Sequence, residues 1–154
     1  MCKGISVLRA RIRQELFEEY ELANRIVERG GQQELHFMYP DPIVQLPVLH
    51  DGRVMIYEWG NRSRKGKLPP TGWCRQESIE AGKWRWLKPE PVVIVANFGL
   101  EKGVWFHIEQ GIRGVVVHDE QERPRVYMLT QDASHYYLTM TKHDRMPVLI
   151  EQEI

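Results

Sequence analysis

The chain has 154 residues, of which 42% are hydrophobic and 27% are charged, and its 21 basic side chains balance its 21 acidic ones. This length fits one domain, residues 1–154, with a substantial core, and the composition excludes an intrinsically disordered protein. No apolar run approaches the length of a membrane span and no apolar signal core follows the first residues, so we expect a cytoplasmic protein. The two cysteines, Cys2 and Cys74, are then expected to be reduced thiols.

The first element that the sequence predicts is a helix over residues 6–28. Apolar residues recur there at three- and four-residue steps with charged residues between them, which is the helical period. Gly30-Gly31 then ends the predicted helix. We expect this helix to cover one face of a sheet.

A β-hairpin and a long loop follow. Residues 43–49 and 54–58 have strand composition, and Asp51-Gly52 between them is a tight-turn dipeptide. Residues 60–72 are polar, basic and interrupted by glycine and proline, which predicts a long loop of the kind that is usually functional or disordered.

The second half of the chain predicts more strands and two short helices. The strand over 91–97 is apolar throughout, as in a strand buried on both faces. Seven strands with few helices indicate an α+β fold, with a mainly β, barrel-like core, an N-terminal helix and short peripheral helices. The other predicted strands are 104–109, 114–118, 125–130 and 146–150, and the predicted short helices are 77–86 and 133–141.

The second residue carries the most distinctive chemistry of the chain. A methionine before a residue as small as cysteine is normally removed, so we expect the mature chain to begin with Cys2. Its α-amine, with an ordinary pKa of about 7.7–8.0, and its thiol, with one of about 8.5, are then attached to neighbouring carbons. The amine condenses with an aldehyde to an imine, and the thiol closes a thiazolidine ring. The alternative is a cysteine without a reactive environment and without a role.

Basic residues gather in one band of this neutral chain. No Asp or Glu lies between Trp59 and Gln76, and the cations of the band are Arg62, Arg64, Lys65, Lys67 and Arg75. Cations beside flat side chains such as Trp59 and Trp73 are typical of sites that bind the phosphates and bases of single-stranded nucleic acid. The alternative is a solvated loop between two core tryptophans.

Two further side chains are candidates for proton transfer. Glu101 follows the buried strand at 91–97, and His143 precedes the last strand beside Asp144 and Arg145. Imine formation loses water and therefore requires a general acid, which a carboxylic acid or an imidazolium can provide. The alternatives are a surface glutamate and a histidine in a turn.

We expect neither a metal site nor a cofactor. The six histidines have no HxH or HxxxH spacing, and neither cysteine belongs to a CxxC pair. Gly60 and Gly66 lie in a basic stretch without the strand, loop and helix context of a phosphate-binding loop.

Several residues, in the same order, resemble the SOS-response-associated peptidase (SRAP) family, whose members are abasic-site sensors of the DNA damage response. The resemblance covers most of the chain from Tyr39 onward together with the first two residues, and its most specific part is the closing run. The matching residues are Met1-Cys2, Trp59-Gly60, Arg75 with Glu77, Glu101 after a strand, and His143-Asp144-Arg145-Met146-Pro147-Val148-Leu149-Ile150.

The resemblance implies both a fold and a function. Family members have a compact, mainly β core, and their N-terminal cysteine attacks the ring-opened aldehyde of an abasic site in single-stranded DNA to form a thiazolidine crosslink. In this chain Cys2 would be the nucleophile, Glu101 the proton-transfer group and His143 an assistant in forming or reversing the imine. Arg75 and Glu77 would line the DNA pocket. The implied protein is a cytoplasmic monomer, nucleoid-associated in a bacterium, and it uses no cofactor.

The chain also departs from the family and is shorter than most members. Lys3-Gly4 follows Cys2 where the family has Gly-Arg, and the aromatic segment around Glu101 is reduced to Phe98-Gly99-Leu100-Glu101-Lys102. Trp73 replaces an asparagine that holds the lesion, and it either stacks against a base or fills the pocket.

Three functions are therefore compared, with the covalent sensor of abasic sites first. The second is a non-covalent module for single-stranded nucleic acid that has lost the crosslinking chemistry, as Trp73 and Lys3 indicate. The third is a thiol peptidase with Cys2 as nucleophile and His143 as base. In the family, proteolysis is best understood as self-processing at the N-terminus, so enzymatic activity, whether autoprocessing or lyase-like, stays an open question.

Overall fold

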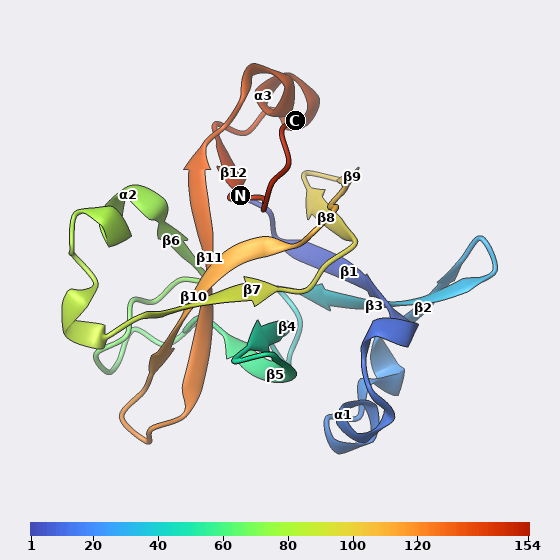
Figure 1. Ribbon diagram of the computed structural model, residues 1–154, viewed down its shortest axis with the longest axis horizontal. Coiled ribbons are helices and arrows are strands. Elements are labelled where there is room, and N and C mark those ends of the chain that lie inside the picture. The colour runs from blue at the N-terminus through green and yellow to red at the C-terminus, as the bar shows by residue number, and fades with distance from the viewer.

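The computed structural model describes residues 1–154, which form twelve strands in two sheets and three short α-helices (Figure 1). The smaller sheet has five strands in the order β2-β3-β1-β8-β9, and all of its neighbouring pairs are antiparallel. Its strands are β1 (Gly4–Leu8), β2 (Ile26–Arg29), β3 (Gln32–Met38), β8 (Phe98–Glu101) and β9 (Val104–His107).

The larger sheet closes into a five-stranded barrel. Its order β10-β7-β4-β5-β11 returns to its start because β10 also pairs with β11. The end of β11 extends beyond the barrel, where it pairs with β12 and, in parallel, with β6. The strands are β4 (Gln45–His50), β5 (Arg53–Trp59), β6 (Trp73–Arg75), β7 (Glu90–Ile94), β10 (Ile112–His118), β11 (Pro124–Asp132) and β12 (Arg145–Pro147).

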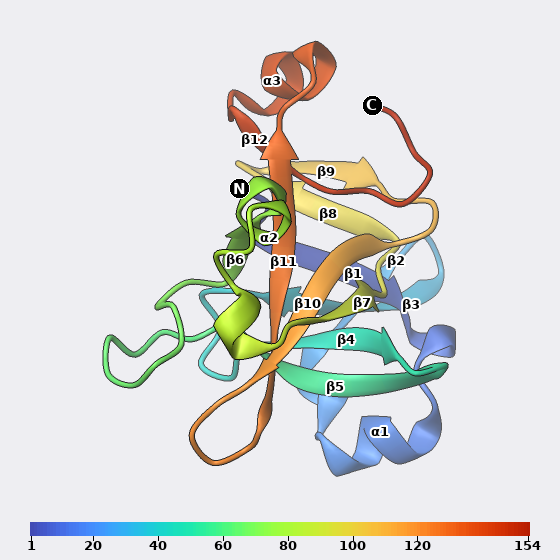
Figure 2. The same ribbon diagram turned by 60° about the vertical axis from the view of Figure 1, so that its left-hand side comes forward.

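The helices are short and lie at the periphery of the two sheets (Figure 2). The longest α-helix has seven residues, whereas a membrane-spanning helix needs about 20, and no helix could span a membrane. The α-helices are α1 (Gln14–Glu19), α2 (Gln76–Glu80) and α3 (His135–Thr141), and the 3-10 helices are Arg9–Arg11, Leu22–Arg25 and Arg85–Leu87.

Alternation of side chains along the central barrel strands explains their continuous hydrophobicity. Val116 of β10 faces the main core, which the barrel shares with the smaller sheet. Its neighbours Val115 and Val117 face a second apolar cluster, which contacts Ile79 of α2. In the same way, Val126 of β11 faces the main core and its neighbour Tyr127 faces the second cluster. Because successive residues of a strand point to opposite faces, a strand buried on both faces must be apolar throughout.

The predicted N-terminal helix over 6–28 is wrong. The segment contains the end of β1, two 3-10 helices, α1 and the start of β2. Ile5 and Val7 of β1 are fully buried because this strand lies between β3 and β8, and Glu21, with φ 50°, ends the helical path after α1. Three- and four-residue spacing of apolar residues arises here from several short elements that each bury one or two of them.

The other predictions along the chain hold in outline, except that the strand predicted over 91–97 ends at Ile94 and is only partly buried, with Pro91 exposed. The hairpin of β4 and β5 turns at Asp51-Gly52, where both residues have positive φ, 51° and 77°, as a two-residue turn of type I′ requires. Residues 60–72 form a loop. The helices predicted at 77–86 and 133–141 are shorter, and the chain has twelve strands rather than seven. The fold is thus α+β, dominated by strands around a closed barrel, as predicted.

Candidate functional site

The first residues of the chain meet a buried carboxylate at the end of β8. The α-amine of Met1 lies 2.8 Å from Oε1 of Glu101. Pairing of β1 with β8 creates this contact, because Gly4 lies opposite Leu100 and the backbone N–H of Lys3 donates to the carbonyl of Leu100. Glu101 is only 2% exposed, so its carboxylate interacts with the amine in an environment that screens charge poorly.

The thiol of Cys2 is fully buried beside this ion pair. Its Sγ donates to the carbonyl of Gly4 at 3.2 Å and packs within the main core. Burial raises the pKa of the Cys2 thiol to about 12, because the thiolate would lose its hydration. The thiol is therefore protonated at neutral pH. The group of this region that can act first as a nucleophile is the N-terminal amine, because the thiol is buried and is not a thiolate.

His143 reaches the same carboxylate from the turn between α3 and β12. Its Nδ1 lies 3.9 Å from Oε1 of Glu101, 3.1 Å from the backbone N–H of Arg145 and 3.2 Å from the carbonyl of Arg145. A neutral ring accepts from the N–H, whereas a protonated ring donates to the carbonyl. The ring therefore has a hydrogen-bonding partner in either protonation state, as a group that transfers protons requires.

A pocket of about 240 Å³ is lined by Met1 and His143. Trp73 forms one of its walls, and its indole N–H donates to the carbonyl of Cys2 at 2.9 Å. The Trp73 ring is held by Tyr39 and Trp59, at centroid distances of 4.7 and 5.6 Å. The lining residues are Met1, Thr71, Trp73, Arg75, Thr130, His143 and Arg145. Larger hollows elsewhere on the surface do not include the amine or His143.

Arg145 is a buried residue of the pocket lining that joins several elements by hydrogen bonds. Its guanidinium donates to Glu77 of α2 at 2.7 and 3.1 Å, to Asp132 at 2.8 Å, and to the carbonyl and hydroxyl of Thr130. Glu77, predicted to line the DNA pocket, instead lies outside the lining and fixes Arg145. Arg75, predicted for the same role, is exposed and lines the pocket.

The pair of Glu77 with Arg145 predicts an acid-dependent loss of stability. The guanidinium holds the pKa of the Glu77 carboxyl at about 2, below its ordinary 4.5. A carboxyl with a lowered pKa stabilises the fold fully above its ordinary value, and this contribution is lost as the pH falls from 4.5 towards 2. We therefore expect the free energy of unfolding of Glu77→Gln to fall less steeply than that of the wild type across this range, in denaturant titrations at successive pH values. Glu80→Gln, on the same helix, is the control and should keep the wild-type slope.

The predicted basic loop connects β5 to β6, and its backbone is held by internal hydrogen bonds. The side chain of Asn61 donates to the carbonyl of Leu68 at 3.0 Å and accepts from the N–H of Ser63 at 3.0 Å. Gly60 has φ 61° and approaches Thr71 so closely that a Cβ would clash, which closes the loop at its base. The loop presents exposed cations and leads directly into Trp73 and the pocket. Those cations are Arg62, Arg64, Lys65 and Lys67.

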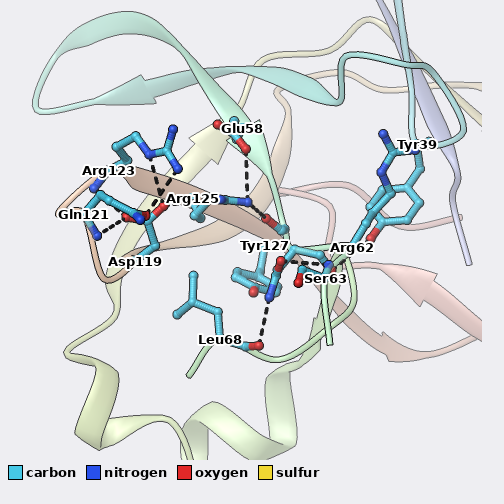
Figure 3. A network of polar contacts seen from close by, with 12 residues as sticks. Tyr39, Glu58, Arg62, Ser63, Leu68, Asp119, Gln121, Arg123, Arg125 and Tyr127 are labelled. Carbon is cyan, nitrogen blue, oxygen red and sulfur yellow. Dashed lines mark hydrogen bonds and ion pairs between the residues drawn. The ribbon is translucent and has the colours of Figure 1, made fainter. Parts of the chain in front are cut away.

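A polar network anchors the loop to the barrel (Figure 3). Arg125 of β11 donates to the carbonyl of Gly60 at 3.0 Å and pairs with Glu58 and Asp119. Arg62 lies beside Tyr39 and donates to its carbonyl at 3.4 Å. Arg125 is thus paired with two acids and Arg62 donates to backbone carbonyls, whereas Arg64, Lys65 and Lys67 are exposed.

One group of possible metal ligands lies away from the pocket. His50, Asp51 and Glu90 place a ligand atom each within 4.8 Å of one another at the tip of the β4–β5 hairpin. Asp51 and Glu90 are exposed there, and Nε2 of His50 is already 2.8 Å from Glu90. This group has no contact with the candidate site and enters none of the chemistry below.

Sequence reasoning named Cys2, Glu101 and His143. The structure places Glu101 beside the Met1 amine and His143, whereas the Cys2 side chain packs in the main core, and only His143 of the three lines the pocket. Sequence reasoning missed Tyr137, whose hydroxyl donates to Oε1 of Glu101 at 3.3 Å, because an aromatic residue in a short helix has no signal of such a role. It also missed the contacts of Arg145 with Glu77, Asp132 and Thr130, although Arg145 belongs to the distinctive run at 143–147. No protein-family model matches the chain, and no curated protein matches it either.

Proposed function

We propose that this protein binds abasic sites in single-stranded DNA and forms a covalent crosslink through an N-terminal Cys2. The observation that carries the proposal is the α-amine of Met1 held 2.8 Å from the buried carboxylate of Glu101, with His143 beside it. Removal of Met1 would leave the free amine on Cys2, one residue further along the chain. The resemblance to the SRAP family adds support, since the same residues occur in the family's order.

The chemistry begins at the amine. The unprotonated amine of Cys2 adds to the aldehyde carbon of the ring-opened abasic sugar, and loss of a water molecule gives an imine. Glu101 takes the proton that the amine releases, and His143 donates to the departing hydroxyl. The thiol then adds across the imine: sulfur bonds to carbon and the proton goes to nitrogen. The product is a thiazolidine, and the net change is the loss of one water.

The basic loop and the pocket walls account for binding of the DNA strand. The exposed cations at 62–67 neutralise phosphates, and Arg75 places one more positive charge at the pocket. The indole N–H of Trp73 is engaged by the carbonyl of Cys2, so this residue offers the lesion a flat apolar wall rather than a hydrogen bond. Base stacking on such a wall is tolerant of sequence. The protein would act as a monomer in the cytoplasm, on the nucleoid of a bacterial cell.

Intact-protein mass spectrometry tests this proposal. We expect the chain without Met1 to gain the mass of a single-stranded oligonucleotide with one abasic site, minus one water. The same oligonucleotide with an intact base should give no adduct. A chain that lacks Met1 and forms no adduct with the abasic strand would contradict the proposal.

The buried thiol favours a second candidate. Cys2 is 0% exposed and Trp73 covers its carbonyl, as expected of a non-covalent module for single-stranded nucleic acid that has lost the crosslinking reaction. Such a module would bind strands with and without an abasic site equally, with an affinity that falls linearly with salt on a log–log plot. Preference for the abasic strand in the same titration would exclude it.

A further inference from the structure

We propose that Tyr137 is a positioning residue of the candidate site, whose hydroxyl holds the Glu101 carboxylate in place beside the N-terminal amine. This inference rests on the proposed function and adds to it a residue that neither the sequence motifs nor the family resemblance supplies. The contact that motivates it joins the Tyr137 hydroxyl to Oε1 of Glu101 at 3.3 Å. The same oxygen faces the amine at 2.8 Å.

The fold holds the Tyr137 ring firmly. Tyr137 belongs to the first turn of α3, where its backbone N–H donates to the capping hydroxyl of Ser134 at 3.1 Å. Its side chain is fully buried, and the edge of Phe106 contacts the ring at a centroid distance of 5.4 Å. The hydroxyl of Thr141 donates to its carbonyl at 2.8 Å. A ring fixed in this way can only present its hydroxyl to Glu101.

Burial also keeps this hydroxyl a donor. Desolvation and the nearby Cys2 and Glu101 raise the pKa of Tyr137 far above its ordinary value, so the hydroxyl stays protonated at neutral pH. A hydrogen bond donated to a carboxylate stabilises its charged form. Without Tyr137, only the amine and the histidine would stabilise the charge of this buried group.

The other titratable groups around Glu101 come from two segments. The Met1 amine and the Cys2 thiol belong to the residues before β1, and His143 comes from the turn after α3. Lys102 is adjacent in sequence but directs its Nζ to the carbonyl of Lys142 at 3.0 Å. During imine formation the amine loses its charge, and His143 changes its protonation state. Tyr137 is therefore the one partner of Glu101 whose hydrogen bond is constant through the reaction.

The variant Tyr137→Phe tests this role, because it removes the hydroxyl and keeps the ring. Tyr127→Phe is a matched control for the titration of Glu101: Tyr127 is equally buried, and its hydroxyl donates to the carbonyl of Pro69 at 2.8 Å rather than to Glu101. Two measurements are made on each chain. One is the NMR titration of the Glu101 side-chain carboxyl signal, and the other is the pH dependence of the rate of adduct formation with the abasic strand.

We expect the Glu101 signal of Tyr137→Phe to titrate at a higher pH than that of the wild type, because the carboxylate loses a donated hydrogen bond that stabilises its charge. The acidic limb of the rate profile should move in the same direction, while the Glu101 titration of Tyr127→Phe matches that of the wild type. Coincident Glu101 titrations in the wild type and Tyr137→Phe would overturn the inference. The NMR titration needs no DNA, so absence of an adduct from the wild type would refute the proposed function while the role of Tyr137 is still decided.

Discussion

The variant Cys2→Ala is expected to form no stable adduct with an abasic oligonucleotide. Alanine is as readily exposed by removal of Met1 as cysteine, so the variant keeps a free N-terminal amine on residue 2. The imine can still form, but no thiol is present to close the thiazolidine ring, and the imine is hydrolysed on denaturation. Borohydride added during the reaction should therefore trap a reduced adduct from Cys2→Ala, whereas mass spectrometry without borohydride should detect none.

Cys74→Ala is the matched control for this experiment. Cys74 of β6 is also buried, and burial raises the pKa of its thiol to about 12 as well. Its environment is therefore like that of Cys2, but it has no free amine beside it. We expect Cys74→Ala to form the stable adduct as the wild type does. A stable adduct from Cys2→Ala, or its loss from Cys74→Ala, would refute the assignment of Cys2 as nucleophile.

The second large effect is expected from Glu101→Gln. The amide has nearly the same shape as the carboxylate but can neither accept the amine proton nor return it. General acid–base catalysis typically contributes 10²–10⁴-fold to a rate, so we expect adduct formation to slow by about 100-fold or more. The measurement is a time course of adduct at saturating abasic strand, which separates the chemical step from binding.

Two further variants make this result specific. Glu34→Gln changes another buried glutamate, 4% exposed, which accepts from Ser6 and Arg29 on the smaller sheet, and it should react at the wild-type rate. Glu101→Asp keeps a carboxylate and should recover part of the rate. If Glu101→Gln reacted as fast as the wild type, the proton transfer would have to be assigned to His143 or to solvent.

The predictions that held depended on a few adjacent residues. The Asp51-Gly52 turn and the alternating residues around it specify the β4–β5 hairpin, because positive φ at two successive positions strongly favours such residues. The run of valines in β10 likewise needs only a strand with two buried faces. In contrast, the predicted helix over 6–28 failed because the periodicity of its apolar residues does not reveal that β1 pairs with β3 and β8.

Part of the candidate site could likewise be predicted from the sequence, and part could not. Cys2, Glu101 and His143 were predicted because their chemistry and their order along the chain can be read from the residues. Nothing in the sequence measures the burial of the Cys2 thiol, which depends on the main core closing around it. The contact of Tyr137 with Glu101 joins α3 to β8 across 36 positions, and no local pattern encodes such a contact.

The sequence by itself determined the class of the fold, the hairpin, the position of the basic loop and the chemistry open to an N-terminal cysteine. These depend on composition, on local backbone preferences and on the functional groups of single residues. Only the tertiary structure decided that the N-terminal amine lies against Glu101, that Trp73 walls the pocket and that Glu77 binds Arg145. Each of these contacts joins residues far apart in the chain, so its existence depends on strand pairing and packing of the whole domain rather than on any one segment.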